Sequence, residues 1–186
     1  MRSFLFFAFV SLSSFLLDIE VSNVNYKSKV DFEGKAYTLN GAGIREKFFL
    51  DIYTIGLYLN SKNFSGDSIL NSRADKLVRI VVVSSFVTAD KFNKGIDEGF
   101  KKSTNNNVDP IMNEIAELKK GFGDDFKVGD KFDVFFSATG ETKIYKSDTN
   151  SVTITGNKIF QKALLAIWIG DDPVTENLKD ELLGID

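Results

Sequence analysis

A long strand-forming segment that carries one arginine constrains this chain more than any other feature. Residues 39–59 begin with a glycine-rich stretch, Gly41-Ala42-Gly43, which predicts a turn, and continue in a run of β-branched and aromatic residues. Such runs favour β-strands. Arg45 lies where the two parts meet. Because a guanidinium in an apolar setting must find an anion, either an internal carboxylate or an anionic ligand has to lie beside Arg45.

Alternation within residues 44–59 predicts a strand that is covered on one face and partly covered on the other. Neither parity is polar throughout, as it would be on a face turned fully to solvent. Arg45, Lys47 and Tyr53 share one parity, so they are expected on the same face, although a β-bulge would reset this pattern. Tyr58 has the opposite parity and is interpreted as a core residue.

The rest of the chain alternates between strand patterns and amphipathic helix patterns. A hairpin is expected around Glu33-Gly34-Lys35. We expect further strands over residues 77–87, 131–137, 143–145 and 152–155, and helices that begin after Thr88, at Asp109-Pro110, over residues 157–168, and at Asp172-Pro173. This order is typical of an α+β fold, an antiparallel sheet with helices packed on one side. The length of 186 residues fits one domain.

Composition excludes several classes of function. The chain has no His and no Cys, which removes Ser-His-Asp and Cys-His nucleophiles, thiol redox chemistry and the usual zinc sites. A net charge of −3 argues against nucleic acid as a partner. We expect no cofactor. The 18 phenylalanines suggest a core or cavity lined with rings, and the candidates to border a cavity are Phe48, Phe49, Phe92 and Phe100.

The first residues are typical of an export signal. Arg2 precedes a largely apolar run without charge over residues 3–17, which is shorter than the about 20 residues that span a bilayer. We therefore predict a signal peptide over residues 1–20, a domain over residues 21–186, and a periplasmic or secreted protein with no membrane span after signal removal. The alternative is an N-terminal helix that stays attached as an anchor or is buried.

Two motifs resemble those of a known family. The first joins Gly41-Ala42-Gly43-Ile44-Arg45 to Ile55-Gly56-Leu57-Tyr58-Leu59, and the second is the run over residues 163–173. In this order they resemble the chalcone isomerase fold family, specifically its bacterial chalcone isomerase-like branch, over about residues 25–184. The resemblance implies an open-faced antiparallel β-sandwich with a layer of helices and a ligand cleft between the layers.

The resemblance also implies a choice between two kinds of function. Plant members cyclise chalcones, whereas non-catalytic relatives bind fatty acids and hold the carboxylate with the family arginine, which here is Arg45. Catalytic members have a threonine where this chain has Tyr53. They also use a tyrosine and an asparagine in the region that here spans residues 88–95, where Asn93 is out of register. These departures favour a binding protein.

Three hypotheses follow. The first is an exported binder of a small amphipathic or aromatic ligand, such as a fatty acid, held by Arg45 with help from Tyr53; Lys47 is then a second cation at the cleft mouth or a solvated side chain. The second is an isomerase or intramolecular lyase for phenolic or enone substrates, in which Arg45, the one catalytic candidate, stabilises a phenolate or enolate. The third is an interaction module with a closed cleft and Arg45 paired to an acid such as Glu46 or Asp51.

Overall fold

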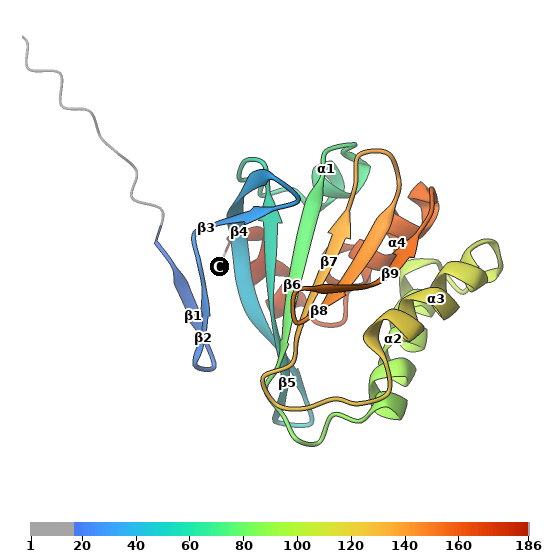
Figure 1. Cartoon of the computed structure of the whole chain (residues 1–186), viewed down its shortest axis with the longest axis horizontal. Coiled ribbons are helices and arrows are strands. Elements are labelled where there is room, and N and C mark those ends of the chain that lie inside the picture. Colours follow the sequence, from blue (N-terminus) through green and yellow to red (C-terminus); the bar gives the residue numbers. More distant parts are fainter. Residues whose placement is uncertain (1–16, 186) are drawn as a thin grey trace, which may run out of the picture.

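The computed structural model describes residues 17–185 and is built around a seven-stranded antiparallel sheet (Figure 1). Its strands lie side by side in chain order: β3 (Lys29–Phe32), β4 (Lys35–Lys47), β5 (Leu50–Leu59), β6 (Lys76–Val82), β7 (Lys131–Phe136), β8 (Thr142–Lys146) and β9 (Thr149–Ile154). The predicted hairpin around Glu33-Gly34-Lys35 joins β3 to β4. Every strand therefore pairs with its neighbour in the sequence, and the helices are inserted between strands or follow the last one.

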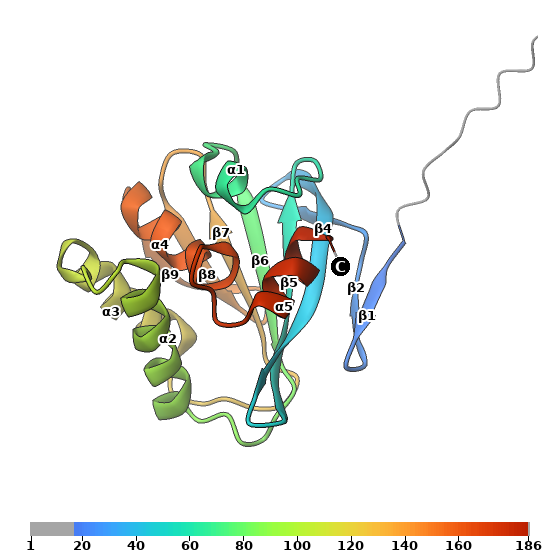
Figure 2. The ribbon, with the colours of Figure 1, turned by 180° about the vertical axis from the view of Figure 1, so that it is seen from behind.

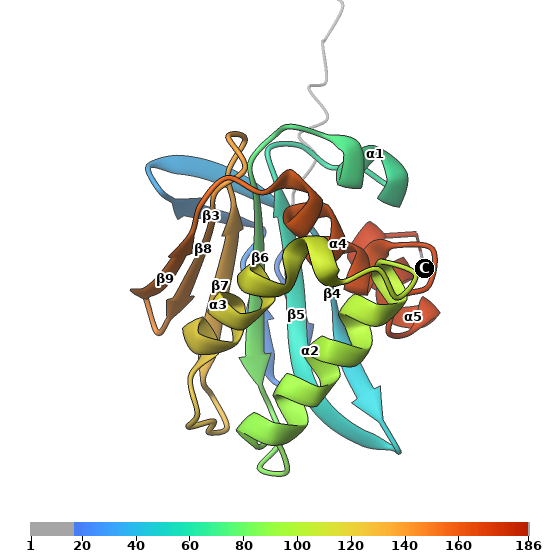
Figure 3. The same cartoon turned by 90° about the vertical axis from the view of Figure 1, so that its right-hand side faces the viewer.

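The helices cover one face of this sheet (Figures 2 and 3). They are α1 (Gly66–Asn71), α2 (Ala89–Ser103), the 3₁₀ turn η1 (Asp109–Ile111), α3 (Met112–Phe122), α4 (Lys158–Ile169) and α5 (Glu176–Leu183). The main core lies between the two layers, where Ile80 and Val134 of the sheet belong to one cluster with Phe100 and Leu118. The predicted α+β fold is confirmed. None of the helices within residues 17–185 has both the length and the apolar content needed to cross a bilayer.

The other face of the sheet is partly covered. A second hairpin, β1 (Ile19–Val21) and β2 (Val24–Tyr26), packs there on a smaller core that includes Tyr37 and Tyr58. Tyr58 is fully buried, so its interpretation as a core residue is confirmed. The sequence patterns had not indicated this hairpin, and its first strand begins inside the stretch assigned to the signal peptide. Residues 1–16 of that stretch lie outside the described residues.

Helix starts follow the side chains that can cap them. The Thr88 hydroxyl accepts a hydrogen bond from the Lys91 amide and begins α2, as predicted. Asp109-Pro110 begins the 3₁₀ turn that leads into α3. The prediction of a helix start at Asp172-Pro173 is wrong, because the last helix begins at Glu176 after Thr175.

The predicted turn at Gly41-Ala42-Gly43 is wrong, because these residues lie inside strand β4. The glycines are needed for a close approach of α5, not for a change of direction. A Cβ atom at Gly41 would overlap the main-chain oxygen of Glu181, and one at Gly43 would overlap the Glu181 carboxylate. That carboxylate accepts a hydrogen bond of 3.1 Å from the Ile44 amide. Helix α5 therefore rests directly on the backbone of β4.

The segment over residues 44–59 is a hairpin and not one strand. Phe48 and Phe49 form its two-residue turn, with φ of +52° and +64°. These angles fit a type I′ turn, in which Asn-Gly is the usual pair because other residues adopt positive φ at a cost of roughly 1–2 kcal/mol each. A bulge then shifts the register between the pairs Glu46↔Asp51 and Arg45↔Tyr53. Arg45 and Tyr53 lie opposite each other, so the prediction of a shared face is confirmed.

Two glycine substitutions should have opposite effects on stability. Gly41→Ala places a methyl group against the backbone of α5 and is expected to lower the free energy of unfolding by about 1–3 kcal/mol. Gly95→Ala, within α2, meets no atom within 4 Å and is expected to raise it by up to about 1 kcal/mol. Urea unfolding followed by circular dichroism measures both changes. Equal midpoints for the two variants would contradict the packing of α5 on β4.

Candidate ligand-binding site

A cavity of about 420 Å³ lies between the β4–β5 hairpin and helix α2. Its volume falls within the roughly 300–1,000 Å³ of small-molecule sites in proteins. Helices α3 and α4 close its inner end, and its walls are mainly apolar: Leu50, Ile52, Phe92, Ile96, Leu118, Phe122, Leu164 and Ile167. No cluster of three or more potential metal-ligating side chains occurs within residues 17–185. The cavity can hold the hydrocarbon or aromatic part of a small molecule.

Arg45 lies on the cavity wall without a carboxylate partner among residues 17–185. Its Nη1 donates a hydrogen bond to the main-chain carbonyl of Glu46, and no ion pair joins Arg45 to an acid within residues 17–185. The Asp51 carboxylate instead accepts a hydrogen bond of 3.1 Å from the Ser22 hydroxyl. The pairing of Arg45 with Glu46 or Asp51 that the closed-cleft hypothesis expected is therefore not formed. Most of the guanidinium donors remain available to a ligand.

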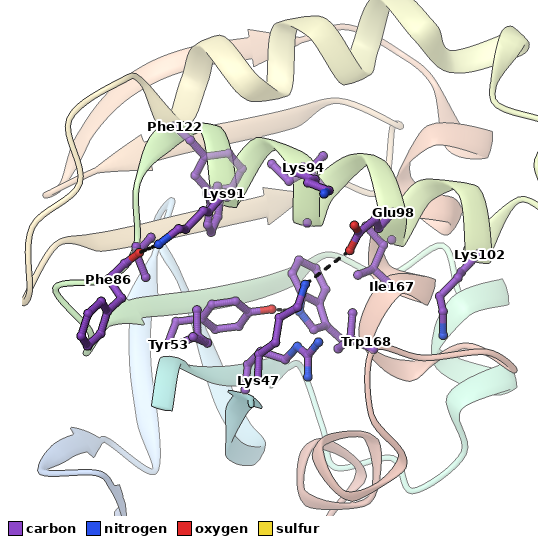
Figure 4. A pocket seen from close by; sticks show the side chains of 18 of the residues that line it. Lys47, Tyr53, Phe86, Lys91, Lys94, Glu98, Lys102, Phe122, Ile167 and Trp168 are labelled. Atoms are coloured by element: carbon purple, nitrogen blue, oxygen red, sulfur yellow. Dashed lines mark hydrogen bonds and ion pairs between the residues drawn. The ribbon is translucent and has the colours of Figure 1, made fainter. Parts of the chain in front are cut away.

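Tyr53 faces Arg45 across the hairpin and is tied to helix α4. The Trp168 Nε1–H donates a hydrogen bond of 2.9 Å to the Tyr53 hydroxyl (Figure 4), and the Tyr53 ring meets Phe92 edge-on at 6.4 Å. Burial raises the pKa of Tyr53, although the hydrogen bond from Trp168 and the charge of Arg45 act in the opposite direction. The phenol is therefore protonated at neutral pH. Because its oxygen already accepts from Trp168, its own proton can be donated to a ligand.

Basic side chains gather around the cavity although the whole chain is acidic. Its charged lining residues are five basic ones and one acid: Arg45, Lys47, Lys91, Lys94, Lys102 and Glu98. Lys47 reaches across the mouth from β4 toward α2, where its Nζ lies 3.5 Å from Glu98 Oε2 (Figure 4). Lys102 pairs with Asp172 at 2.8 Å, and the Lys91 Nζ donates to the carbonyl of Phe86. The cationic excess favours an anionic ligand.

The structure brings the three candidate residues of the sequence analysis to one cavity, with Arg45 and Tyr53 on its wall and Lys47 at its mouth. Of the phenylalanines considered as its border, Phe48 and Phe92 line it. Phe100 instead stacks on Phe160 in the core, at 5.7 Å between ring centroids, and Phe49 points into solvent.

Several site residues were missed. The charged side chains of α2 at positions 91, 94, 98 and 102 were not among the predicted site residues. Their spacing of three, four and four residues does place them along one edge of the helix, and this signal was present in the sequence. Trp168 belongs to the predicted helix over residues 157–168 and to the second family motif, and neither pattern marks it as a site residue. No local signal connects it to Tyr53, which lies 115 positions earlier in the chain.

Removing the Tyr53 hydroxyl should destabilise the fold. Tyr53→Phe leaves the Trp168 N–H without its acceptor at a buried position, which is expected to lower the free energy of unfolding by about 1–3 kcal/mol. Tyr145→Phe is the matched control, because it removes an exposed hydroxyl whose partner is Glu33. Urea unfolding, read by the emission of the single tryptophan, measures both. A loss no larger for Tyr53→Phe than for Tyr145→Phe would show that the buried hydrogen bond contributes nothing.

Comparison with known proteins identifies the family to which this fold belongs. Residues 18–184 match the family model described as chalcone isomerase-like. A crystal structure of a fatty-acid binding protein of Arabidopsis thaliana is similar, with a TM-score of 0.67 over 90% of this chain and 96% of that chain, at 13% sequence identity. This identity shows a shared fold only. No curated protein matches this chain in sequence. The family match covers nearly all the described residues, and this chain therefore belongs to the chalcone isomerase-like family.

Proposed function

We propose that this chain is a non-catalytic binding protein for a small amphipathic anion, with a fatty acid as the ligand class. The observation that carries the proposal is the Arg45 guanidinium, which lies on the wall of an apolar cavity and pairs with no carboxylate in the described part of the chain. The fatty-acid binding protein of similar fold adds support. Each methylene buried in such a cavity contributes about 0.8 kcal/mol, so an acyl chain supplies most of the affinity and Arg45 sets its orientation.

The head group would meet three polar side chains. Arg45 can offer two parallel N–H donors to a carboxylate, and the Tyr53 hydroxyl, held by Trp168, can add a third hydrogen bond. Lys47 is the second cation, and its pairing with Glu98 spans the mouth through which a ligand would enter. We propose that a ligand displaces this exposed pair on entry, because pairs of this kind contribute only about 0–1 kcal/mol.

Two observations weigh against the alternatives. An isomerase would need a group that accepts a proton at neutral pH, but burial raises the pKa of Tyr53, at the position matched to the family's catalytic threonine, so its phenol stays protonated and cannot be that base. A chalcone absorbance assay would reveal turnover that depends on Arg45 if this reading were wrong. A closed interaction module would lack space beside Arg45, where a cavity of about 420 Å³ is present.

Binding of a fatty acid should depend on Arg45 through its charge. We expect the wild-type chain to bind palmitate more tightly than methyl palmitate in titrations that follow Trp168 emission. Arg45→Ala is expected to weaken palmitate binding about 10- to 100-fold, since a hydrogen bond to a charged group contributes about 1.5–3 kcal/mol, and to leave the ester unchanged. Arg73→Ala, an exposed arginine between α1 and β6, is the matched control.

A second variant tests whether the ligand occupies the cavity. Gly95 lines it and has open space at its Cβ position, so Gly95→Phe should fill the cavity and abolish binding of both acid and ester. If the wild-type chain binds neither compound, or if both bind equally to all variants, the proposal fails.

We also propose that the chain is exported to a periplasm or an extracellular space. The uncharged run over residues 3–17 supports this. We place the cleavage before Asp18, because its carboxylate pairs with Lys27 at 2.8 Å and strand β1 begins at Ile19. The chain recovered from the exported fraction of its cells should have lost its N-terminal residues, with the cut at or before the bond between Leu17 and Asp18. Its measured mass gives the cleavage position. A chain of full mass that stays inside the cell would contradict export.

A further inference from the structure

Three exposed phenylalanines surround the mouth of the cavity. Phe48 and Phe49 form the turn between β4 and β5 and are 84% and 103% exposed; Phe86, in the connection from β6 to α2, is 59% exposed. The start of β5 pairs with the end of β6, so the turn and the connection lie at the same end of the sheet (Figure 3). Phe48 and Phe86 also line the cavity. The apolar surface outside is therefore continuous with the apolar interior.

The fold itself does not account for these rings. Phe48 and Phe49 stand at the two positive-φ positions of the turn, where Asn-Gly would be unstrained. Neither ring packs in a core cluster within residues 17–185. Exposed apolar patches of this kind mark surfaces that meet another apolar phase or partner. Their position points to a contact made at the cavity mouth.

A lipid surface fits these rings better than a protein partner. The three phenylalanines together supply roughly 450–750 Å² when buried, which is below the roughly 800 Å² that each partner contributes to a standard protein interface. A narrow turn that projects its rings can instead enter the interfacial layer of a bilayer, where aromatic rings are enriched and lysines extend to the head groups.

Two lysines lie beside the rings, where they can reach lipid head groups. The Lys47 Nζ lies 5.9 Å from the centre of the Phe48 ring, and the Lys91 Nζ lies 3.1 Å from the carbonyl oxygen of Phe86 (Figure 4). Both can meet lipid phosphates while the rings are inserted. The acids Glu46, Asp51, Asp90 and Glu98 lie at this end too, so attachment depends on ring insertion and local phosphate contacts and not on net charge.

We propose that this end of the chain docks on the surface of a lipid bilayer. The rings of Phe48, Phe49 and Phe86 enter the interfacial layer, Lys47 and Lys91 contact phosphates, and the cavity mouth faces the membrane. An amphipathic ligand then passes between bilayer and cavity without crossing water. The passage of a ligand rests on the proposed function, whereas the docking of the rings on the bilayer does not.

Quenching by brominated lipids tests the docking directly. In the full chain, Phe49→Trp combined with Trp168→Phe puts the single indole at the turn. Phe64→Trp combined with Trp168→Phe is the matched control, because Phe64 is 55% exposed and follows β5 at the opposite end of the sheet. With vesicles of phosphatidylcholine and phosphatidylglycerol that carry brominated acyl chains, we expect quenching at position 49 to be several-fold stronger than at position 64.

Residues 1–16 are identical in the two chains, so their own affinity for lipid does not account for such a difference. Equal quenching at the two positions, or none at position 49, would overturn the proposal. The result does not depend on fatty-acid binding, so failure of docking and failure of the proposed ligand are distinguished.

A second variant keeps the turn and removes the ring at position 49, which does not line the cavity. Phe49→Gly places glycine, the preferred residue, at the second positive-φ position of the turn and is expected to fold at least as stably as the wild type. The transfer of palmitate from vesicles to the chain should slow several-fold, while affinity for palmitate added in solution stays unchanged. If the variant instead converts a dimer of the wild type to a monomer on size exclusion, and quenching is absent, a second copy covers the rings and the lipid proposal is wrong.

Discussion

The contact between helix α5 and strand β4 sets the geometry of the whole cavity. Gly41, Gly43 and Arg45 follow one another on the inner face of β4, and α5 covers the two positions that have no side chain. The Ile44 amide is bound by the carboxylate of Glu181 at the same place. Arg45 is then the next inner-face residue of the strand. Helix α5 packs on Gly41 and Gly43 and leaves Arg45 uncovered, so the Arg45 side chain lines the cavity.

A second long-range contact joins the helical layer to the wall that carries Arg45. Trp168 of α4 is buried and donates its N–H to Tyr53, which joins the helical layer to the β5 strand beside Arg45. This hydrogen bond holds the phenol oxygen in place and leaves its proton for another acceptor. An apolar volume with two such donors at one wall is suited to an amphipathic anion, since hydrocarbon burial supplies affinity and the donors select the charged end.

The hairpin tip serves a different purpose from the hairpin stem. In the stem, the bulge beside Arg45 aligns that residue with Tyr53 and places Ile52 along the cavity. At the tip, two phenylalanines occupy a strained turn that a smaller pair would form more easily. The positive φ angles reduce folding stability, and neither ring packs in a core cluster within residues 17–185. The proposed contact with a bilayer would account for both features, and the tip lies at the entrance through which a ligand would pass.

Local patterns in the sequence were sufficient for the fold class. Arg45 and Tyr53 share a face as predicted, but through a hairpin and its bulge and not through alternation along one strand. Alternation, the Thr88 cap and the hairpin at Glu33-Gly34-Lys35 depend on neighbouring residues, so they can be read along the chain. The role of Gly41 and Gly43 could not be read in this way, because glycine serves a turn and a close helix contact equally well. Only the folded chain shows that α5, about 140 positions later, lies on these glycines. The pairs Lys47–Glu98 and Tyr53–Trp168 likewise arise from packing between distant elements, since periodicity indicates which face a residue occupies and not what will cover that face.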